Sequence, residues 1–289
     1  MRVYQARVPD LIADQTLETY VTHAMPLLPQ FVIRDAFAHR DVKMNGVRSN
    51  ADARVEPGAA VLLYTSWEIE LPVVYEDARI LILNKPAGIS CEGDEYGGMS
   101  VQSLLDGRPD HPRLCHRLDN QTSGLLAAAK DEASEECLLK AFRDRTLDKK
   151  YECIVKGAPQ PAEQTVTGYI IHDEKLGRMR VVSHPTPEAR QIVTGYETLF
   201  SNRTTSHLKV TLFTGRTHQI RAHMAYLQHP ILGDDVYGDR KFNQRMNTRR
   251  LMLCATELTM MAGGPLSDLD GKTFSIKPNF QEKQCGTSN

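Results

Sequence analysis

Two short segments of this chain concentrate side chains that could carry out chemistry. Residues 116–123 bring together an imidazole, a guanidinium, a carboxylate, amides and two hydroxyls, directly before an apolar run. The carboxylate of Asp119 could act as a nucleophile or as a general base. It could equally be one half of a structural ion pair, and this segment alone leaves the alternatives open.

The second segment, residues 214–223, has the composition of an anion site. A threonine at its start can cap a following helix, and both helix N-termini and arginines attract negative groups. Arg216 and Arg221 therefore predict contacts with a phosphate or a carboxylate. His218 and His223 are five residues apart and lie on different helix faces, which argues against a metal site of the HExxH kind.

Motifs for cofactors are missing from the sequence. There is no G-x-G-x-x-G, and the Gly-Lys-Thr run at 271–273 has Leu266 where a phosphate-binding loop needs glycine. The six cysteines include no Cys-x-x-Cys pair, so we expect reduced thiols and neither a zinc site nor a disulfide framework. We expect no metal and no small-molecule cofactor.

The charge of the chain is balanced but unevenly distributed. A net charge of −1, from 35 basic and 36 acidic residues, does not by itself indicate a nucleic-acid-binding protein. Residues 198–233, however, contain no Asp or Glu, and residues 240–250 contain five cations and no acid. Because local fields depend on distribution, we expect these two stretches to contribute to a basic surface.

Length and composition indicate an ordinary globular protein. The 289 residues suggest about two domains, and 41% hydrophobic with 25% charged residues is typical of a folded chain. No apolar run approaches the ~18 residues that span a bilayer, and the N-terminal segment lacks the apolar core of a secretory signal. We expect a cytoplasmic protein without membrane association and, in the absence of coiled-coil heptads, a monomer.

The first 66 residues predict a small α+β domain. Apolar spacing favours two helices, and an alternating run that leads into Asn-Gly is a strong hairpin signal. The predicted elements are helices within 10–28 and over 31–40, an alternating run over 42–47 and a strand over 60–64.

This domain resembles the ribosomal-protein-S-four-like RNA-binding domain over residues 12–66. In that family a basic helix precedes a V-x-x-N-G strand, and a Pro-Gly turn precedes an apolar strand; each feature is present here. The resemblance implies RNA contacts from four basic residues, Arg34, Arg40, Lys43 and Arg48. The alternative is a small domain without a role in binding.

A second, larger domain is predicted over residues 73–280, after an extended linker at 67–72 and before a flexible tail at 281–289. Short apolar runs with a period of two outnumber helical patterns. The fold class is therefore α+β, with a large, mostly antiparallel mixed sheet flanked by helices. Strands are expected at 79–84, 124–129, 151–155, 166–171, 179–182, 192–199, 207–213 and 251–258, and helices at 100–105, 133–143 and 217–227.

Five separated blocks of the second domain resemble the RluA family of pseudouridine synthases. The blocks are NKPAG at 84–88, HRLD-x-x-TSGLL at 116–126, KKY at 149–151, GRTHQIR-x-H at 215–223 and HPILGD with YG at 229–238. The resemblance covers about residues 68–262. It implies that the protein isomerises uridine in structured RNA to pseudouridine, with ribosomal RNA expected before transfer RNA, and that RNA is its partner.

The same resemblance implies roles for individual residues. Asp119 matches the catalytic Asp, Arg221 the Arg that pairs with it, and Tyr151 the active-site Tyr proposed to assist proton removal. Arg117 matches a residue proposed to fill the space that the target base vacates. Further RNA contacts are expected from His116, Thr122, Arg216 and His218, and support of the site from Asn84, Lys85, Leu118 and Ile220.

These residue types suit the reaction. Uracil is detached from ribose, turned and rejoined through carbon 5, so no redox cofactor is required. A cation within about 4–6 Å favours the ionised form of a partly buried carboxylate, and this is the role expected of Arg221. Asp119 could attack the anomeric carbon or abstract a ribose proton. The competing hypotheses are a non-catalytic RNA-binding or assembly factor and, less favoured, a glycoside hydrolase, which would need a second carboxylate.

Overall fold

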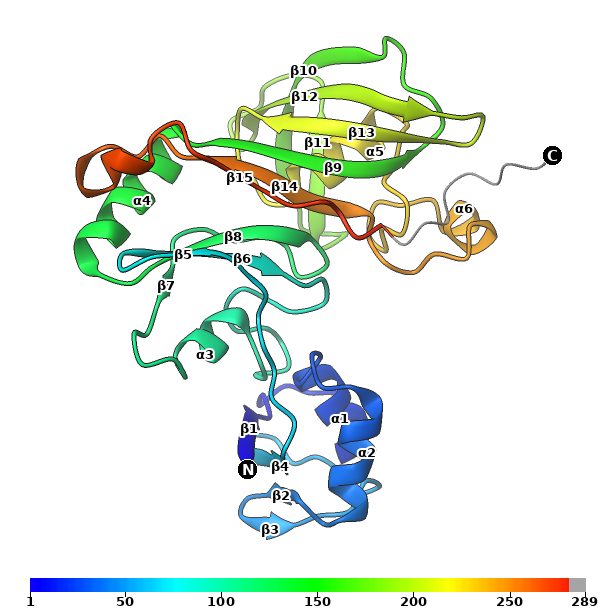
Figure 1. Ribbon diagram of the computed structural model, residues 1–289. Helices are drawn as coiled ribbons and strands as arrows, with labels where there is room; N and C mark the ends of the chain where they lie inside the picture. The colour runs from blue at the N-terminus through cyan, green and yellow to red at the C-terminus, as the bar shows by residue number, and fades with distance from the viewer. Residues whose placement is uncertain (281–289) are drawn as a thin grey trace, which may run out of the picture. The chain divides into compact units, whose positions relative to one another are not determined.

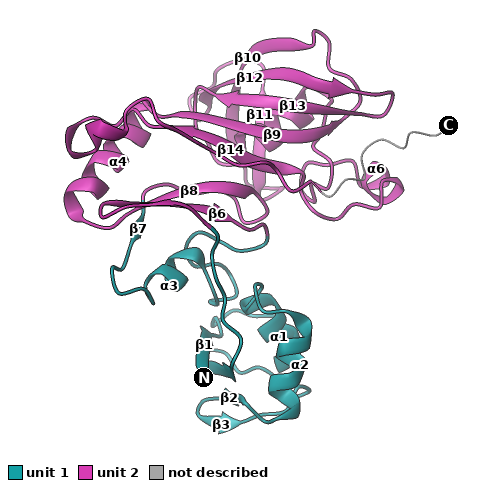
Figure 2. Ribbon diagram, viewed as in Figure 1, with its two compact units in different colours: residues 1–72, 88–114 teal, residues 73–87, 115–289 magenta. Residues whose placement is uncertain are grey.

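A computed structural model describes residues 1–280 and divides the chain into two compact units (Figures 1 and 2). The first unit consists of residues 1–72 and 88–114, and the second of residues 73–87 and the chain from 115 onwards. The tail predicted at 281–289 lies outside the described residues.

The first unit contains a four-stranded sheet in the order β1-β4-β2-β3. Its β2–β3 hairpin turns at Asn45 and Gly46, both at positive φ (50° and 81°), as a two-residue hairpin turn of type I′ requires. Strand β1 was not predicted from the sequence. The elements are β1 Arg2–Arg7, α1 Leu17–Ala24, α2 Gln30–Ala38, β2 Val42–Met44, β3 Val47–Arg48, β4 Ala60–Thr65, α3 Val101–Leu105 and β7 Arg113–Leu114.

Residues 88–114 pack within this first unit, although the sequence placed them in the larger domain. The Met99 N–H donates to the carbonyl of Ala24 at 2.7 Å, and the Tyr20 hydroxyl donates to the carbonyl of Tyr96 at 2.8 Å. Residues 88–114 thus supply a donor to the last residue of α1 and an acceptor to a side chain in the middle of that helix. A sequence pattern does not report such a pairing, because the partners are far apart along the chain.

The second unit is built on a sheet in the order β11-β10-β12-β13-β9-β14-β8-β6-β5. Along this order β8 and β14 are parallel and the other pairs are antiparallel, which confirms the predicted mostly antiparallel mixed sheet. Its strands are β5 Val73–Glu76, β6 Ile80–Lys85, β8 Ser123–Ala129, β9 Asp148–Lys156, β10 Glu163–Asp173, β11 Arg178–Val182, β12 Arg190–Ser201, β13 Thr205–Leu212, β14 Leu253–Thr259 and β15 Thr273–Ser275.

The parallel contact between β8 and β14 is short and tight. Its register pairs Ser123 with Cys254 and Gly124 with Ala255. Gly124 has a φ of 119°, and a Cβ there would overlap the backbone of Ala255. Only glycine allows the two backbones this close approach.

Helices flank the sheet of the second unit. Helix α4 (Glu132–Asp144) begins at Asp131, whose carboxylate accepts the Ser134 N–H at 2.9 Å, and packs on the β8 side with Leu138 and Ala141. Helix α5 (Gln219–Tyr226) packs through Ala222 against β10–β12. The remaining elements, α6 (Arg240–Arg245) and the 3₁₀ helix η1 (Gly264–Leu269), were not predicted.

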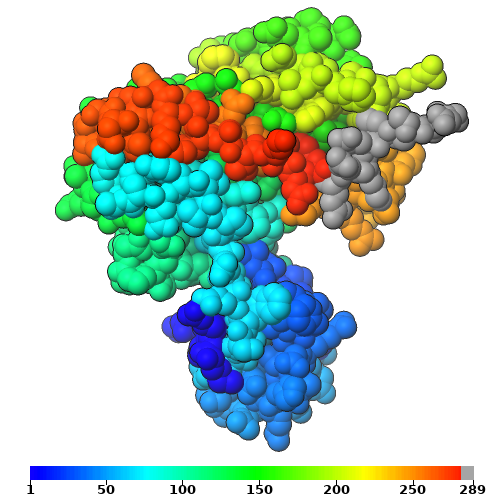
Figure 3. All heavy atoms as spheres, viewed as in Figure 1, coloured from blue at the N-terminus to red at the C-terminus, as the bar shows by residue number. Residues whose placement is uncertain are grey.

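The last described segment returns to the edge of the sheet. In Figure 3 the orange and red spheres of η1 and β15 lie against the cyan strands. The Lys272 ammonium sits 3.9 Å from the ring centroid of Tyr75, on β5. This packing closes one side of the core that supports β8.

Candidate active site

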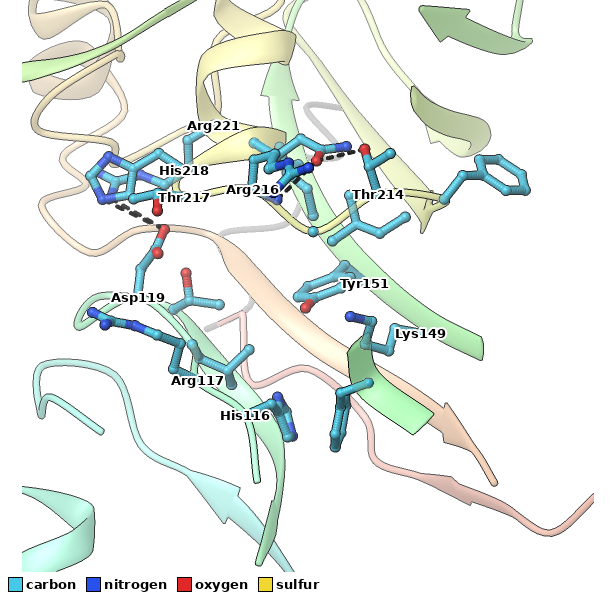
Figure 4. Close-up of a pocket in the computed structure, with 18 of the residues that line it drawn as sticks. His116, Arg117, Asp119, Lys149, Tyr151, Thr214, Arg216, Thr217, His218 and Arg221 are labelled. Carbon is cyan, nitrogen blue, oxygen red and sulfur yellow. Dashed lines mark hydrogen bonds and ion pairs between the residues drawn. The ribbon is translucent and has the colours of Figure 1, made fainter. Parts of the chain in front are cut away.

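A cavity of about 470 Å³ opens within the second unit, where four segments converge (Figure 4). They are the loop before β8, the end of α4, strand β9 and the loop before α5. The sequence-predicted residues that line it are His116, Arg117, Leu118, Asp119, Thr122, Tyr151, Arg216, His218, Ile220 and Arg221. Residues more than 100 positions apart in the chain are thus brought together as expected.

Asp119 lies in a turn that is held from beneath by Lys85. The Asp119 carbonyl accepts the Thr122 N–H at 3.0 Å. The Lys85 side chain is fully buried, and its ammonium donates to the carbonyl of Asn120 at 3.0 Å and to that of Pro86 at 3.0 Å. Lys85 therefore fixes the loop that carries the carboxylate. Asn84 pairs with Leu125 across β6 and β8, and its supporting role stays a prediction.

Arg221 is anchored chiefly by Asp234, not by Asp119. Its Nε and Nη2 atoms donate to the two Asp234 oxygens at 2.8 and 3.0 Å, and Nη2 also contacts Asp235 at 3.1 Å. The distance from Nη1 to the Asp119 Oδ2 is 3.6 Å, a looser ion pair. The resemblance implied a single acidic partner for Arg221, Asp119, and the structure shows three.

Asp234 is the residue that sequence reasoning missed. Its side chain is fully buried, and Oδ1 additionally accepts the backbone N–H groups of Val236 and Tyr237 at 2.9 and 2.8 Å. These bonds and the two from Arg221 fix the Asp234 carboxylate in place. Arg221 is therefore held rigidly, with its remaining nitrogen, Nη1, directed toward Asp119. The only signal in the sequence was the position of Asp234 within the HPILGD block.

Tyr151 stands on β9 with 7% of its surface exposed. Burial, and then the negative charge of Asp119, raise the pKa of its phenol. Because a raised pKa keeps the phenol protonated, Tyr151 is a neutral hydroxyl near pH 7 and a poor general base on its own. It can donate or relay a proton at close range.

His218 faces Asp119 from the opposite wall. Its Nε2 is 3.8 Å from the Asp119 Oδ2, and Nδ1 lies 3.0 Å from the Tyr237 hydroxyl. That hydroxyl accepts the Met179 N–H at 3.0 Å, so it can donate its own proton to Nδ1 and leave an Nε2–H toward Asp119. Burial lowers the pKa of His218, which favours this neutral ring.

His116 forms part of the wall as a neutral ring. It stacks on Phe142 with 4.2 Å between ring centroids, and its Nε2 accepts the Ala127 N–H at 3.0 Å. Burial and the charge of Lys149 lower the pKa of His116 to about 3. The imidazole therefore shapes the cavity and does not supply a positive charge.

Gln219 holds the loop before α5 over the cavity. Its side-chain oxygen accepts from the Thr214 hydroxyl at 2.8 Å and from the Arg216 N–H at 3.1 Å, and its amide donates to Thr194 at 3.0 Å. His223 shares the Thr194 hydroxyl at 3.0 Å and lies outside the cavity. Within residues 1–280 no cluster of His, Cys, Asp and Glu side chains could hold a metal ion.

Comparisons with known proteins identify the family. A family model described as RNA pseudouridylate synthase matches residues 79–226. The chain belongs to the RNA pseudouridylate synthase family. The matched range contains the predicted site residues Asp119, Tyr151 and Arg221, and the enzyme is an RNA pseudouridine synthase.

Relatives of this RNA pseudouridine synthase match most of its length. The ribosomal large subunit pseudouridine synthase C of Vibrio cholerae is 28% identical over 272 residues, covering 86% of this chain and 85% of the relative. An uncharacterised RNA pseudouridine synthase of Mycobacterium bovis is 33% identical over 279 residues, covering 87% of each. The structure of human RNA Pseudouridylate Synthase Domain Containing 4 superposes with a TM-score of 0.58 at 25% identity, covering 72% of this chain and 88% of that one.

The four basic residues predicted to bind RNA in the first unit of this RNA pseudouridine synthase lie on α2, the residues after it and the β2–β3 hairpin. Arg34, 72% exposed in its side chain, lies 3.7 Å from Glu18, and the Lys43 ammonium is 4.9 Å from the ring centroid of Tyr64. Arg40 and Arg48 are exposed. The RNA-binding role of this unit stays a prediction. Among the described residues, no helix is both long and apolar enough to cross a membrane.

Proposed function

We propose that this enzyme isomerises specific uridines of ribosomal RNA, with Asp119 as the catalytic residue. The observation that carries the proposal is the convergence of Asp119, Tyr151 and Arg221 on one cavity inside the region matched by the family. The relatives named for the large ribosomal subunit support ribosomal RNA as the substrate. We also propose a cytoplasmic monomer.

The target uridine must leave its stack to reach Asp119, at a cost of a few kcal/mol. Arg117 is exposed at the cavity wall and is drawn beside Asp119 in Figure 4. Its guanidinium plane can occupy the vacated space by stacking and by contacting phosphate. The apolar side chains of Leu118 and Ile220 limit access of water to the detached base.

The reaction breaks the bond from the anomeric carbon to N1 of uracil and forms a bond from the same carbon to C5. A proton leaves C5 and one is gained at N1, so the product is an isomer of the substrate. Asp119 either attacks the anomeric carbon or removes a ribose proton. Tyr151, as a neutral phenol beside Asp119, relays the C5 proton rather than holding a standing negative charge.

The decisive experiment compares two carboxylates that both contact Arg221. Asp119→Asn should reduce pseudouridine formation by roughly 10²–10⁴-fold or more, the usual range for an essential acid or base. Asp235→Asn, which removes the same charge at a side chain 68% exposed, should retain most activity. The substrate is total RNA from cells that lack the enzyme, and the readout is site-resolved mapping of pseudouridine.

The outcomes of this mapping also decide between the alternatives. Modification of transfer RNA alone would reject ribosomal RNA as the target. Full activity of Asp119→Asn would reject the catalytic assignment. Rescue of every deletion phenotype by an inactive Asp119→Asn would favour a non-catalytic assembly factor.

The first unit is proposed to contribute RNA affinity through its basic residues. Replacing Arg34 and Arg48 together by Ala should weaken binding of the modified RNA and lower the salt dependence of the affinity by up to about two units of slope. Turnover at saturating RNA should be unchanged, because neither residue lines the cavity.

A further inference from the structure

Lys149 is a cation in the cavity that the proposed reaction does not use. It precedes Tyr151 by two residues on β9, so both side chains lie on the same face of the strand, about 7 Å apart along it. In Figure 4 its amino group points toward the Tyr151 hydroxyl and into the opening. Lys150 lies on the other face and does not line the cavity.

The two neighbouring lysines differ in their partners. Lys150 forms ion pairs with Glu257 at 3.5 Å and with Asp148 at 3.8 Å. Within residues 1–280, no carboxylate lies within ion-pair distance of Lys149. A partly buried ammonium without an acidic partner is unfavourable, because its desolvation is not compensated.

The surroundings of Lys149 add positive charge instead of removing it. Its ammonium lies 5.5 Å from the ring centroid of Phe142 and next to Gly215. Burial, and then the charge of Arg145, lower the pKa of Lys149. Arg145 adopts the left-handed conformation at the end of α4, with a φ of 60°, which is uncommon for a residue other than glycine.

Arg145 and Arg216 line the same cavity as Lys149, and neither has a carboxylate partner among the described residues. The nearby ring of His116 is neutral, as shown above, and its Nε2 is already occupied. This part of the cavity therefore contains the cationic side chains of Lys149, Arg145 and Arg216 without an acidic partner in the described part of the chain. It lies next to Tyr151, whose pKa is raised in part by the charge of Asp119. Such an arrangement attracts an anion with several acceptor oxygens.

We infer that Lys149 and Arg145 form a phosphate subsite that binds a phosphodiester beside the flipped uridine. The inference rests on the proposed function, in which an RNA nucleotide enters the cavity. The negatively charged phosphodiester serves as the ion-pair partner that Lys149 lacks among the described residues. Its binding keeps the ribose in place while uracil is detached and turned. Lys149 is thus a substrate-positioning residue.

The test uses the matched variants Lys149→Met and Lys150→Met of the full-length enzyme, with an RNA fragment that contains one mapped target uridine. Lys149→Met should raise KM and the dissociation constant roughly 10- to 100-fold, the range for a lost charge-assisted hydrogen bond, with a much smaller change in kcat. It should also lower the salt slope of binding by about one unit. Lys150→Met should match the unaltered enzyme, and Lys149→Arg should restore most of the affinity.

A chemical substitution in the RNA identifies the phosphate itself. Methylphosphonate, which is uncharged, replaces one linkage at a time on either side of the target uridine. The unaltered enzyme should lose affinity at one linkage, and Lys149→Met should be insensitive at that linkage alone. A loss of kcat with unchanged KM, or equal sensitivity of both proteins at every linkage, would overturn the subsite.

Thermal unfolding separates this role from a structural one. Because Lys149 lacks an acidic partner, Lys149→Met should unfold at the same temperature as the unaltered enzyme or at a higher one. A lower unfolding temperature together with unchanged RNA affinity would show a structural lysine and contradict the inference. If the unaltered enzyme modifies a uridine of another RNA and none of ribosomal RNA, the proposed function is refuted, and the methylphosphonate series around that uridine would still test the subsite.

Discussion

Two of the cationic side chains that line the cavity, Arg221 and Lys149, differ in their partners. Arg221 is 4% exposed and contacts three carboxylates, two of them through hydrogen bonds of about 3 Å. Lys149 lines the same cavity without a carboxylate among the described residues. A buried cation that pairs with carboxylates of the protein is held in a fixed position. A cation without an acidic partner in an open cavity is available to bind an anionic ligand.

Lys85 shows that a buried ammonium need not be left unsatisfied. It lies beneath the same site and donates to the backbone carbonyls of Pro86 and Asn120, which fixes the Asp119 loop. The fold can therefore neutralise the cost of a buried lysine when the position is structural. This contrast is what singles out Lys149.

The largest expected effect is at Asp234. Asp234→Ala removes the two shortest hydrogen bonds of Arg221 and leaves a buried guanidinium without its main partner. We expect the free energy of unfolding, measured by urea denaturation, to fall by about 3–5 kcal/mol and activity to be lost. Asp235→Ala should cost less than about 1 kcal/mol, because that carboxylate is 68% exposed. Equal losses for both variants would remove the distinction between them.

A smaller effect should appear in the pH dependence of stability. The pKa of His116 is about 3 in the folded state, below the value of about 6.5 expected in the unfolded chain. Its neutral ring therefore stabilises the fold above pH 6.5, and this stability is lost as the pH falls toward 3, by about 1.4 kcal/mol per pH unit. In the His116→Phe variant, the free energy of unfolding, measured by urea denaturation, should decrease less steeply as the pH falls from 6.5 to 3. An unchanged slope would mean that other groups dominate.

The smallest expected effect is the influence of Lys149 on the pKa of His116. The positive charge of Lys149 contributes to the low pKa of His116, after burial. Lys149→Met should therefore raise the pKa of His116 slightly, because the larger cause persists. An NMR titration of the imidazole measures the shift, with Lys150→Met as the control that leaves it unchanged.

Local patterns were sufficient to predict much of the fold. Alternating apolar residues located the strands of the large sheet, and the antiparallel mixed architecture is confirmed. Asp239 caps α6, and Phe242 anchors it in the core, but six residues make fewer than two turns and carry no periodic signature. Strand β1 was missed because its apolar alternation is weak and its pairing partner, β4, lies more than 50 residues away.

The ionic connections of the candidate site could not be predicted from the sequence. Asp119, Tyr151 and Arg221 line one cavity, and their catalytic roles stay predictions. Asp234 follows Arg221 by 13 residues through an irregular segment, and no helical or strand spacing relates the two. Likewise, two adjacent lysines of identical type differ only through which strand face each occupies and what lies opposite. Three-dimensional neighbours decide such assignments.

The short parallel ladder at Gly124 has a consequence for synthesis of the protein. Asp119 precedes β8 and Tyr151 lies on β9, and among the described residues β14 pairs with both strands. A nascent chain that has not yet emerged beyond Thr259 lacks the strand that pairs with both β8 and β9. We therefore expect the reaction centre to assemble only near the end of translation.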